Sequence, residues 1–202
     1  FNTASGYYAL KSNTTSTQNT AVGACSLFAN TTGAQNNAFG LSALQNNTTG
    51  ADNTAVGHVA LFTNTTGGQN TAIGRNALDA NTTASNNTAV GYNSLSANTT
   101  GDDNVAVGRE ALLENTTASG NTALGNQALR ETTTGATNTA VGAAALYANT
   151  TGTNNVAVGN SALASNTTGS ENTVIGVTTA DAVTSASSVT AVGYGALGAC
   201  TT

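Results

Sequence analysis

The sequence contains no proline, methionine or tryptophan, and charged residues make up only 6% of its 202 residues. A soluble globular domain usually carries about 25% charged residues, so this is not the composition of an ordinary enzyme. Disordered chains are rich in proline and charge, and they do not match it either. Only four basic residues stand against nine acidic ones. We therefore predict no nucleic-acid binding, which needs clustered Lys and Arg.

Long hydrophobic runs are also missing. No apolar segment approaches the ~18 residues of a membrane-spanning helix, so we predict no membrane span. The sequence starts at Phe1 without a methionine and without a basic-then-apolar leader. We expect either a mature secreted product or a piece of a longer chain.

Residues that could carry chemistry are scarce. His58 is the one histidine, so a Ser-His-Asp or Cys-His arrangement would have to use it, and no base-orienting carboxylate is implied beside it. Asp102 and Asp103 are the densest acidic pair, for which a solvated corner is the simpler interpretation than a calcium or glycosidase site. We predict that the chain is not an enzyme and holds no cofactor and no metal.

The two cysteines, Cys25 and Cys200, lie 175 residues apart. They are too few for a disulfide framework and lack the spacing of a metal site. Two interpretations stay open: a disulfide between them, or two incidental small residues.

What the sequence does contain is a repeat. Ala, Thr, Asn and Gly make up 127 of the 202 residues, and they recur with a strict period of 17. The consensus is N-T-A-V-G-x-x-A-L-x-x-N-T-T-G-x-x, and residues 1–202 form a single repeat domain. The twelve copies start at Asn2, Asn19, Asn36, Asn53, Asn70, Asn87, Asn104, Asn121, Asn138, Asn155, Asn172 and Val189.

We number the positions of the repeat from 1 to 17, starting at these residues. Position 5 is always Gly, position 9 is Leu in eleven copies, and position 4 is apolar in eleven. All thirteen charged residues fall at positions 6, 7, 10, 11, 16 or 17. Because unpaired charges are excluded from a packed interior, the repeat has a fixed inside and a variable outside.

A 17-residue unit cannot bury its own apolar face, but stacked copies can. We predict an all-β fold, a β-solenoid or β-roll of about twelve coils stacked ~4.8 Å apart. Val and Leu ladders would form the core, and Gly at positions 5 and 15 would turn the corners. Asn at positions 1 and 12 would form hydrogen-bonded ladders.

Positions 8 and 9 are both restricted, which strict strand alternation does not explain. We prefer an arc with two neighbouring inward side chains. The alternative is a curved α/β solenoid with a short helical turn in each coil. The Asn-Thr-Thr triplets, such as the one at Asn30, are also glycosylation sequons.

The aromatic residues occupy variable positions, where exposed aromatics can mark an interface. Candidates for lateral or partner contacts are Tyr7, Tyr8, Phe28, Phe62, Tyr92, Tyr147 and Tyr194. We expect Tyr7, Tyr8 and Phe28 to lie close together, as a lateral contact or a carbohydrate platform. Isolated surface aromatics are an equally ordinary interpretation.

The segments Asn53-Thr-Ala-Val-Gly57 and Asn155-Val-Ala-Val-Gly159 resemble the head repeats of trimeric autotransporter adhesins and the repeat regions of phage tail-fibre proteins. The resemblance covers nearly the whole chain. It implies left-handed β-rolls, one coil per repeat, in three parallel chains. It also implies an extracellular or cell-surface location and a structural or binding role.

Three functions follow as hypotheses. The first is an extracellular structural protein that stacks end to end into a stiff filament, with itself as partner. The second is an adhesin head or tail-fibre shaft, in which a homotrimer presents its variable positions to a surface receptor or glycan. The third is an ice-binding solenoid, because paired threonines fill positions 13 and 14 of the repeat.

Overall fold

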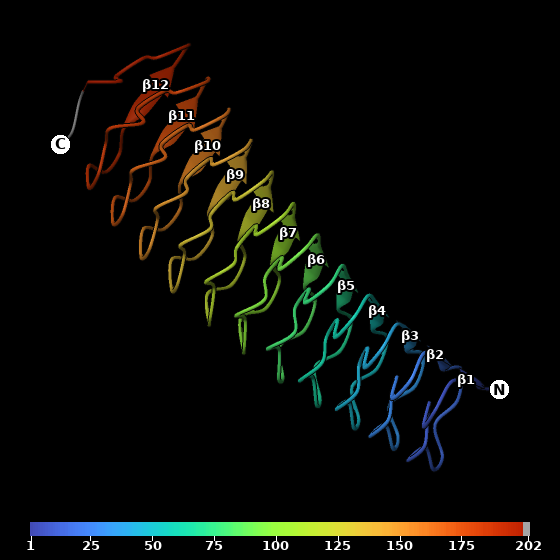
Figure 1. Cartoon of the computed structure of the whole chain (residues 1–202). Coiled ribbons are helices and arrows are strands. Elements are labelled where there is room, and N and C mark those ends of the chain that lie inside the picture. Colours follow the sequence, from blue (N-terminus) through green and yellow to red (C-terminus); the bar gives the residue numbers. More distant parts are fainter. Residues whose placement is uncertain (200–202) are drawn as a thin grey trace.

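The structure, a computed structural model, describes residues 1–199. These residues form a parallel β-solenoid with one short strand in each 17-residue coil (Figure 1). The coils follow one another along a rod from β1 to β12, with the strands on one side and long loops on the other. The predicted all-β solenoid is confirmed, and residues 1–199 contain no helix.

Each of the twelve strands covers positions 2 to 4 of its repeat. They are β1 (Thr3–Ser5), β2 (Thr20–Val22), β3 (Asn37–Phe39), β4 (Thr54–Val56), β5 (Thr71–Ile73), β6 (Thr88–Val90), β7 (Val105–Val107), β8 (Thr122–Leu124), β9 (Thr139–Val141), β10 (Val156–Val158), β11 (Thr173–Ile175) and β12 (Thr190–Val192). They form one sheet in sequence order, and all neighbours are parallel.

The register between neighbouring coils is constant along the rod. Residues 17 apart are paired at every joint, as Thr71 is with Thr88. The N–H of Thr71 donates to the carbonyl of Asn87 at 2.8 Å, and the N–H of Gly74 donates to the carbonyl of Val56 at 2.8 Å. Each coil thus donates backbone hydrogen bonds to both the preceding and the following coil along the rod.

Glycine at position 5 is required by the corner that follows the strand. Gly74 has φ +139°, and a Cβ built there would lie 2.3 Å from the carbonyl oxygen of Gly91. Position 15 is different, because its glycines do not have positive φ. At Gly50, a Cβ would lie 2.3 Å from the carbonyl oxygen of Gly67, so close stacking of coils selects the small residue there.

Left-handed residues other than glycine shape the rest of the coil, at positions 7, 9 and 17. In the fifth coil Asn76 has φ 55° and Leu78 has φ 54°. The two left-handed residues flank Ala77, and both Ala77 and Leu78 are fully buried. This arc brings two consecutive side chains inside, so positions 8 and 9 are both restricted without any helical turn.

The core consists of alanine and leucine. Alanines at positions 3 and 8 and leucines at position 9 are almost all completely buried. The predicted valine ladder in the core is wrong, because position 4 points outward: Val56 and Val107 are each 37% exposed. Side chains alternate along a strand, so the inward Ala at position 3 places positions 2 and 4 on the outer face.

Two asparagine ladders run through the rod, as the sequence predicted. At position 12, the Asn64 amide donates to Oδ1 of Asn47 at 2.8 Å, and the Asn81 amide donates to Oδ1 of Asn64 at 2.8 Å. At position 1, the backbone N–H of Asn53 donates to Oδ1 of Asn36 at 3.0 Å. From the second coil onward the ladder asparagines are buried, and the ladders satisfy polar groups that would be costly to leave unpaired.

Candidate interaction surfaces

Residues 1–199 enclose no cavity or cleft. They bring together no group of three His, Cys, Asp or Glu side chains that could hold a metal ion. Nor do they include a helix with the length and apolarity of a membrane crossing. Candidate function therefore lies on the outer surface of the rod.

The most extensive feature is an exposed apolar row on the sheet, which we call the apolar rail. It consists of the position 4 side chains of β2 to β12: Val22, Phe39, Val56, Ile73, Val90, Val107, Leu124, Val141, Val158, Ile175 and Val192. Most are 37% to 42% exposed, and Val192 is 66% exposed. A solvated strand position accepts polar residues as readily as apolar ones, and a contiguous exposed apolar row is a common feature of interaction surfaces.

Threonine predominates in a second row beside the rail, at position 2 of the strands. Neither row holds a charged residue. Together they make the outer face of the sheet uncharged from one end of the described rod to the other. Uncharged, partly apolar patches are typical of the central part of protein interfaces.

A second feature, which we call the aromatic–lysine cluster, lies in the first two coils. The ring centroids of Tyr7 and Tyr8 are 3.9 Å apart, and those of Tyr8 and Phe28 are 5.9 Å apart. The Nζ of Lys11 lies 3.9 Å from the centroid of the Tyr8 ring and 5.5 Å from that of Phe28. The structure thus places three aromatic rings and one ammonium group side by side.

The other aromatic candidates do not join this cluster. Phe62, Tyr92, Tyr147 and Tyr194 belong to four separate coils, and no ring pair connects any of them within the described chain. Tyr147 has its own partner, because its hydroxyl accepts a bond from Nη1 of Arg130 at 3.3 Å.

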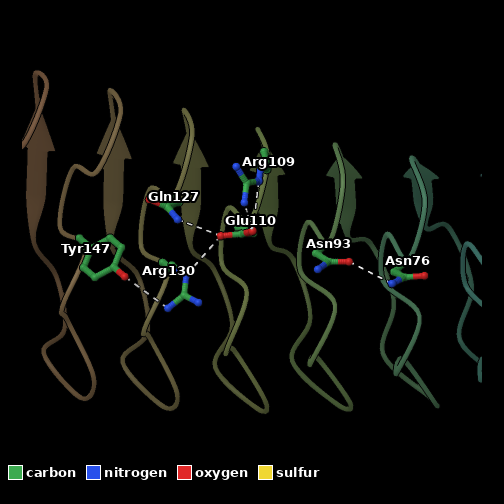
Figure 2. Close-up of polar contacts among 7 residues, drawn as sticks. All are labelled: Asn76, Asn93, Arg109, Glu110, Gln127, Arg130 and Tyr147. Carbon is green, nitrogen blue, oxygen red and sulfur yellow. Dashed lines mark hydrogen bonds and ion pairs between the residues drawn. The ribbon is translucent and has the colours of Figure 1, made fainter.

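A polar network crosses coils seven to nine (Figure 2). Glu110 stands at its centre and is almost fully buried at 9% exposure. It accepts bonds from Nη2 of Arg109 at 2.8 Å and from Nε2 of Gln127 at 2.8 Å. Arg130 reaches the same carboxylate, with Nε 3.5 Å from Oε2. A variable position can therefore hold a buried charge where adjacent coils pair it.

These partners also set the ionisation of the network. Hydrogen bonds from Gln127 and Arg109 hold the pKa of Glu110 below its usual value, even though desolvation opposes them. Farther along the same row, the amide of Asn76 donates to Oδ1 of Asn93 at 3.0 Å (Figure 2). The network links neighbouring coils and pairs both oxygens of the Glu110 carboxylate.

The other candidates for chemistry among the described residues are either isolated from one another or bonded to the backbone. His58 is exposed at position 6. Asp102 accepts a bond from the backbone N–H of Ser85 through Oδ1 at 2.7 Å, so it ties one corner to the preceding coil. Cys25 is a free, half-buried thiol, whereas Cys200 lies outside the described residues.

From the second coil onward, the asparagine side chains that would accept a sugar in the Asn-Thr-Thr glycosylation sequons are buried in the folded rod. The asparagines at Asn30, Asn64 and Asn98 are fully buried, and their amides donate within the position 12 ladder, as Asn64 does to Asn47. Within the adjoining pair of threonines, the first hydroxyl is also used: Oγ1 of Thr31 donates to the carbonyl of Thr48 at 3.0 Å. The second threonine, such as Thr32, is exposed.

Sequence reasoning brought Tyr7, Tyr8 and Phe28 together but missed Lys11, the apolar rail and the Glu110 network. The rail carried a signal, since position 4 is apolar in eleven copies, but apolar restriction alone does not separate an inner from an outer row. No protein family model matches the chain, and neither a curated protein nor a solved structure is significantly similar to it.

Proposed function

We propose that this chain is a structural rod of an extracellular fibre, and that its partner is a further copy of itself. The observation that carries the proposal is that the sheet's ladder of backbone hydrogen bonds ends in an edge strand at each end of the described rod. Within residues 1–199, β1 and β12 are edge strands, each paired on one side only. Unpaired strand edges are templates for another strand.

The two edges are complementary. At the last joint, the N–H of Thr173 donates to the carbonyl of Val189 and the N–H of Gly193 donates to the carbonyl of Ile175, both at 2.8 Å. The same pattern carried one step further would join the N–H of Thr190 to a carbonyl of Asn2 in the next molecule. Because its two surfaces are different and each copy would continue the stacking along the rod axis, such an interface does not close into a ring and extends without limit.

Electron microscopy of the purified chain tests end-to-end stacking. Twelve coils make a rod of about 55–60 Å, so objects many times longer indicate stacking, and isolated short rods at high concentration overturn it. The variant Ala4→Pro removes an N–H that, by strand alternation, points away from β2. Because edge strands tolerate proline, this variant should fold and shorten the filaments, whereas Ala4→Ser should not.

The second candidate is a laterally associated shaft or adhesin head, a homotrimer as the family resemblance implies. The apolar rail favours it, because an apolar row that runs along β2 to β12 offers a long continuous contact surface. A standard interface needs such an extended surface, since it buries about 800 Å² per partner. Light scattering coupled to size exclusion gives the mass of the wild type and of the double variant Ile73→Lys, Val107→Lys. A trimeric wild type and a monomeric variant support lateral association, and a monomeric wild type contradicts it.

An ice-binding role has weaker support. The first threonine of each pair donates its hydroxyl to a backbone carbonyl of the following coil, as Thr31 and Thr48 do. The free hydroxyls then form one row at a corner rather than a two-row flat array.

A further inference from the structure

The aromatic–lysine cluster differs from the rest of the rod in charge as well as in ring content. Lys11 is the only charged side chain in residues 1–51, and all nine acidic residues lie beyond them. No ion pair involves Lys11 among the described residues. The chain is acidic overall, with a formal charge of −5, but residues 1–51 carry one positive side chain and no negative one.

The ammonium group of Lys11 is held by the rings rather than by a carboxylate. At 3.9 Å from the Tyr8 centroid it makes a cation–π contact, which is attractive but leaves most of its charge unneutralised. Tyr7 is 67% exposed and Tyr8 is 43% exposed. The cluster therefore presents open ring surface and an unpaired positive charge within one patch.

This combination fits a sugar that carries an acidic group. A pyranose ring offers an apolar C–H face that can lie on an aromatic ring, and a carboxylate or sulfate at its edge can pair with an ammonium group. The described residues contain no cavity, so the ligand has to lie across an open surface, as an extended polymer does.

We propose that the cluster of Tyr7, Tyr8, Lys11 and Phe28 is a binding platform for an acidic polysaccharide. Tyr7 and Tyr8 supply the stacking surface, Phe28 supports the Tyr8 ring from the second coil, and Lys11 pairs with the acidic group. The platform depends on neither end-to-end stacking nor lateral association, so it goes beyond the structural role proposed above.

The repeat itself supplies substitutions that should not unfold the rod. Ala144 occupies the same left-handed position as Tyr8, with φ 54° against 59°. Gln45 occupies the same position as Lys11. Tyr8→Ala and Lys11→Gln therefore place residues that the fold already accepts at equivalent sites. Tyr92→Ala is the matched control, because Tyr92 is also 43% exposed but stands alone.

The experiment measures binding of polygalacturonate, a uronic-acid polymer, and of neutral dextran to the full chain by isothermal titration calorimetry, with circular dichroism to verify folding. The wild type should bind polygalacturonate more tightly than dextran, and more weakly as salt rises. Tyr8→Ala and Lys11→Gln should each weaken binding about tenfold or more, a loss typical of hot-spot truncation. Tyr92→Ala should leave binding unchanged.

Four outcomes would overturn the proposal. The first is a wild type that fails to bind the acidic polymer. The second is equal binding of dextran, which removes the need for an acidic group. The third is equal effects of Tyr8→Ala and Tyr92→Ala, which would mean that the cluster is not the site. A folded Tyr8→Ala variant that loses self-association but keeps polygalacturonate binding would likewise assign the cluster to contacts between copies.

Discussion

Thr132 occupies the place of an asparagine in the position 12 ladder and leaves Oδ1 of Asn115 without a hydrogen bond. The Thr132 hydroxyl is unpaired as well. On the other side of the gap, the Asn149 amide donates to the carbonyl of Gly152 at 3.0 Å but reaches no preceding Oδ1. This substitution thus interrupts the ladder on both sides, and Val183 at position 12 of the eleventh coil likewise leaves Oδ1 of Asn166 without a hydrogen bond.

Thr132→Asn should repair the ladder. The new amide can donate to Oδ1 of Asn115, and the new Oδ1 can accept from Asn149. Because an unsatisfied buried polar group costs about 1–3 kcal/mol, we expect the free energy of unfolding to rise by about that amount in denaturant titrations. Thr132→Val removes only the unpaired hydroxyl and should stabilise less. A Thr132→Asn variant no more stable than Thr132→Val would contradict this account.

The sequence was sufficient to predict the solenoid, its period and the asparagine ladders. Strict recurrence at 17 residues requires equivalent positions to stack, so a buried polar residue that recurs in neighbouring coils meets its own copies. Asn47 and Asn64 do so. The same logic failed at position 4. The absence of charge there was interpreted as burial, but an outward apolar row such as that of Val56 and Val107 also excludes charge.

The left-handed residues were only partly predictable. Position 17 offers a signal, since Asn86 and Asp103 belong to residue types that tolerate positive φ, and they have φ 61° and 60°. Position 9 offers none, because leucine is not typical of that conformation, and its burial compensates for the backbone cost. The Lys11 and Glu110 contacts depend on side chains that meet across coils, which a repeat pattern does not specify.

Gly74→Ala should be among the most destabilising single substitutions in the rod. Its Cβ would lie 2.3 Å from the carbonyl oxygen of Gly91, at a φ of +139° that alanine rarely adopts. Steric overlap and backbone strain together cost several kcal/mol. Thermal unfolding should show a large fall in Tm or loss of the fold. Gly68→Ala is the control: position 16 holds alanine in other coils, such as Ala34 and Ala51, and its unfolding temperature should change little.

Glu110 should make stability depend on pH. Its pKa is lowered by the bonds from Gln127 and Arg109, so the carboxylate stabilises the fold above its unfolded-state pKa. That contribution is lost as the pH falls through the lower folded-state pKa. Wild type should be more stable than Glu110→Gln at pH 7, and the difference should shrink once the pH falls below about 4.5. Glu114→Gln, at an exposed neighbouring position, should show a smaller difference, and equal effects would contradict the role of the network.

Asp79 should show the opposite sign. Burial raises the pKa of its carboxyl above the usual value, although backbone hydrogen bonds from Asp79 and Ala80 counteract part of the shift. A raised folded-state pKa means that the charged form is disfavoured in the fold. The penalty is therefore fully present above that pKa and disappears as the pH falls below the unfolded-state value.

Asp79→Asn should therefore be more stable than wild type at pH 7, and the two should converge as the pH falls below about 4. Asp181→Asn, at the same repeat position, is the control. Denaturant titrations at pH 7 and pH 3 measure the free energy of unfolding of each variant. If Asp79→Asn is less stable than wild type at pH 7, favourable contacts stabilise the carboxylate and burial does not penalise it.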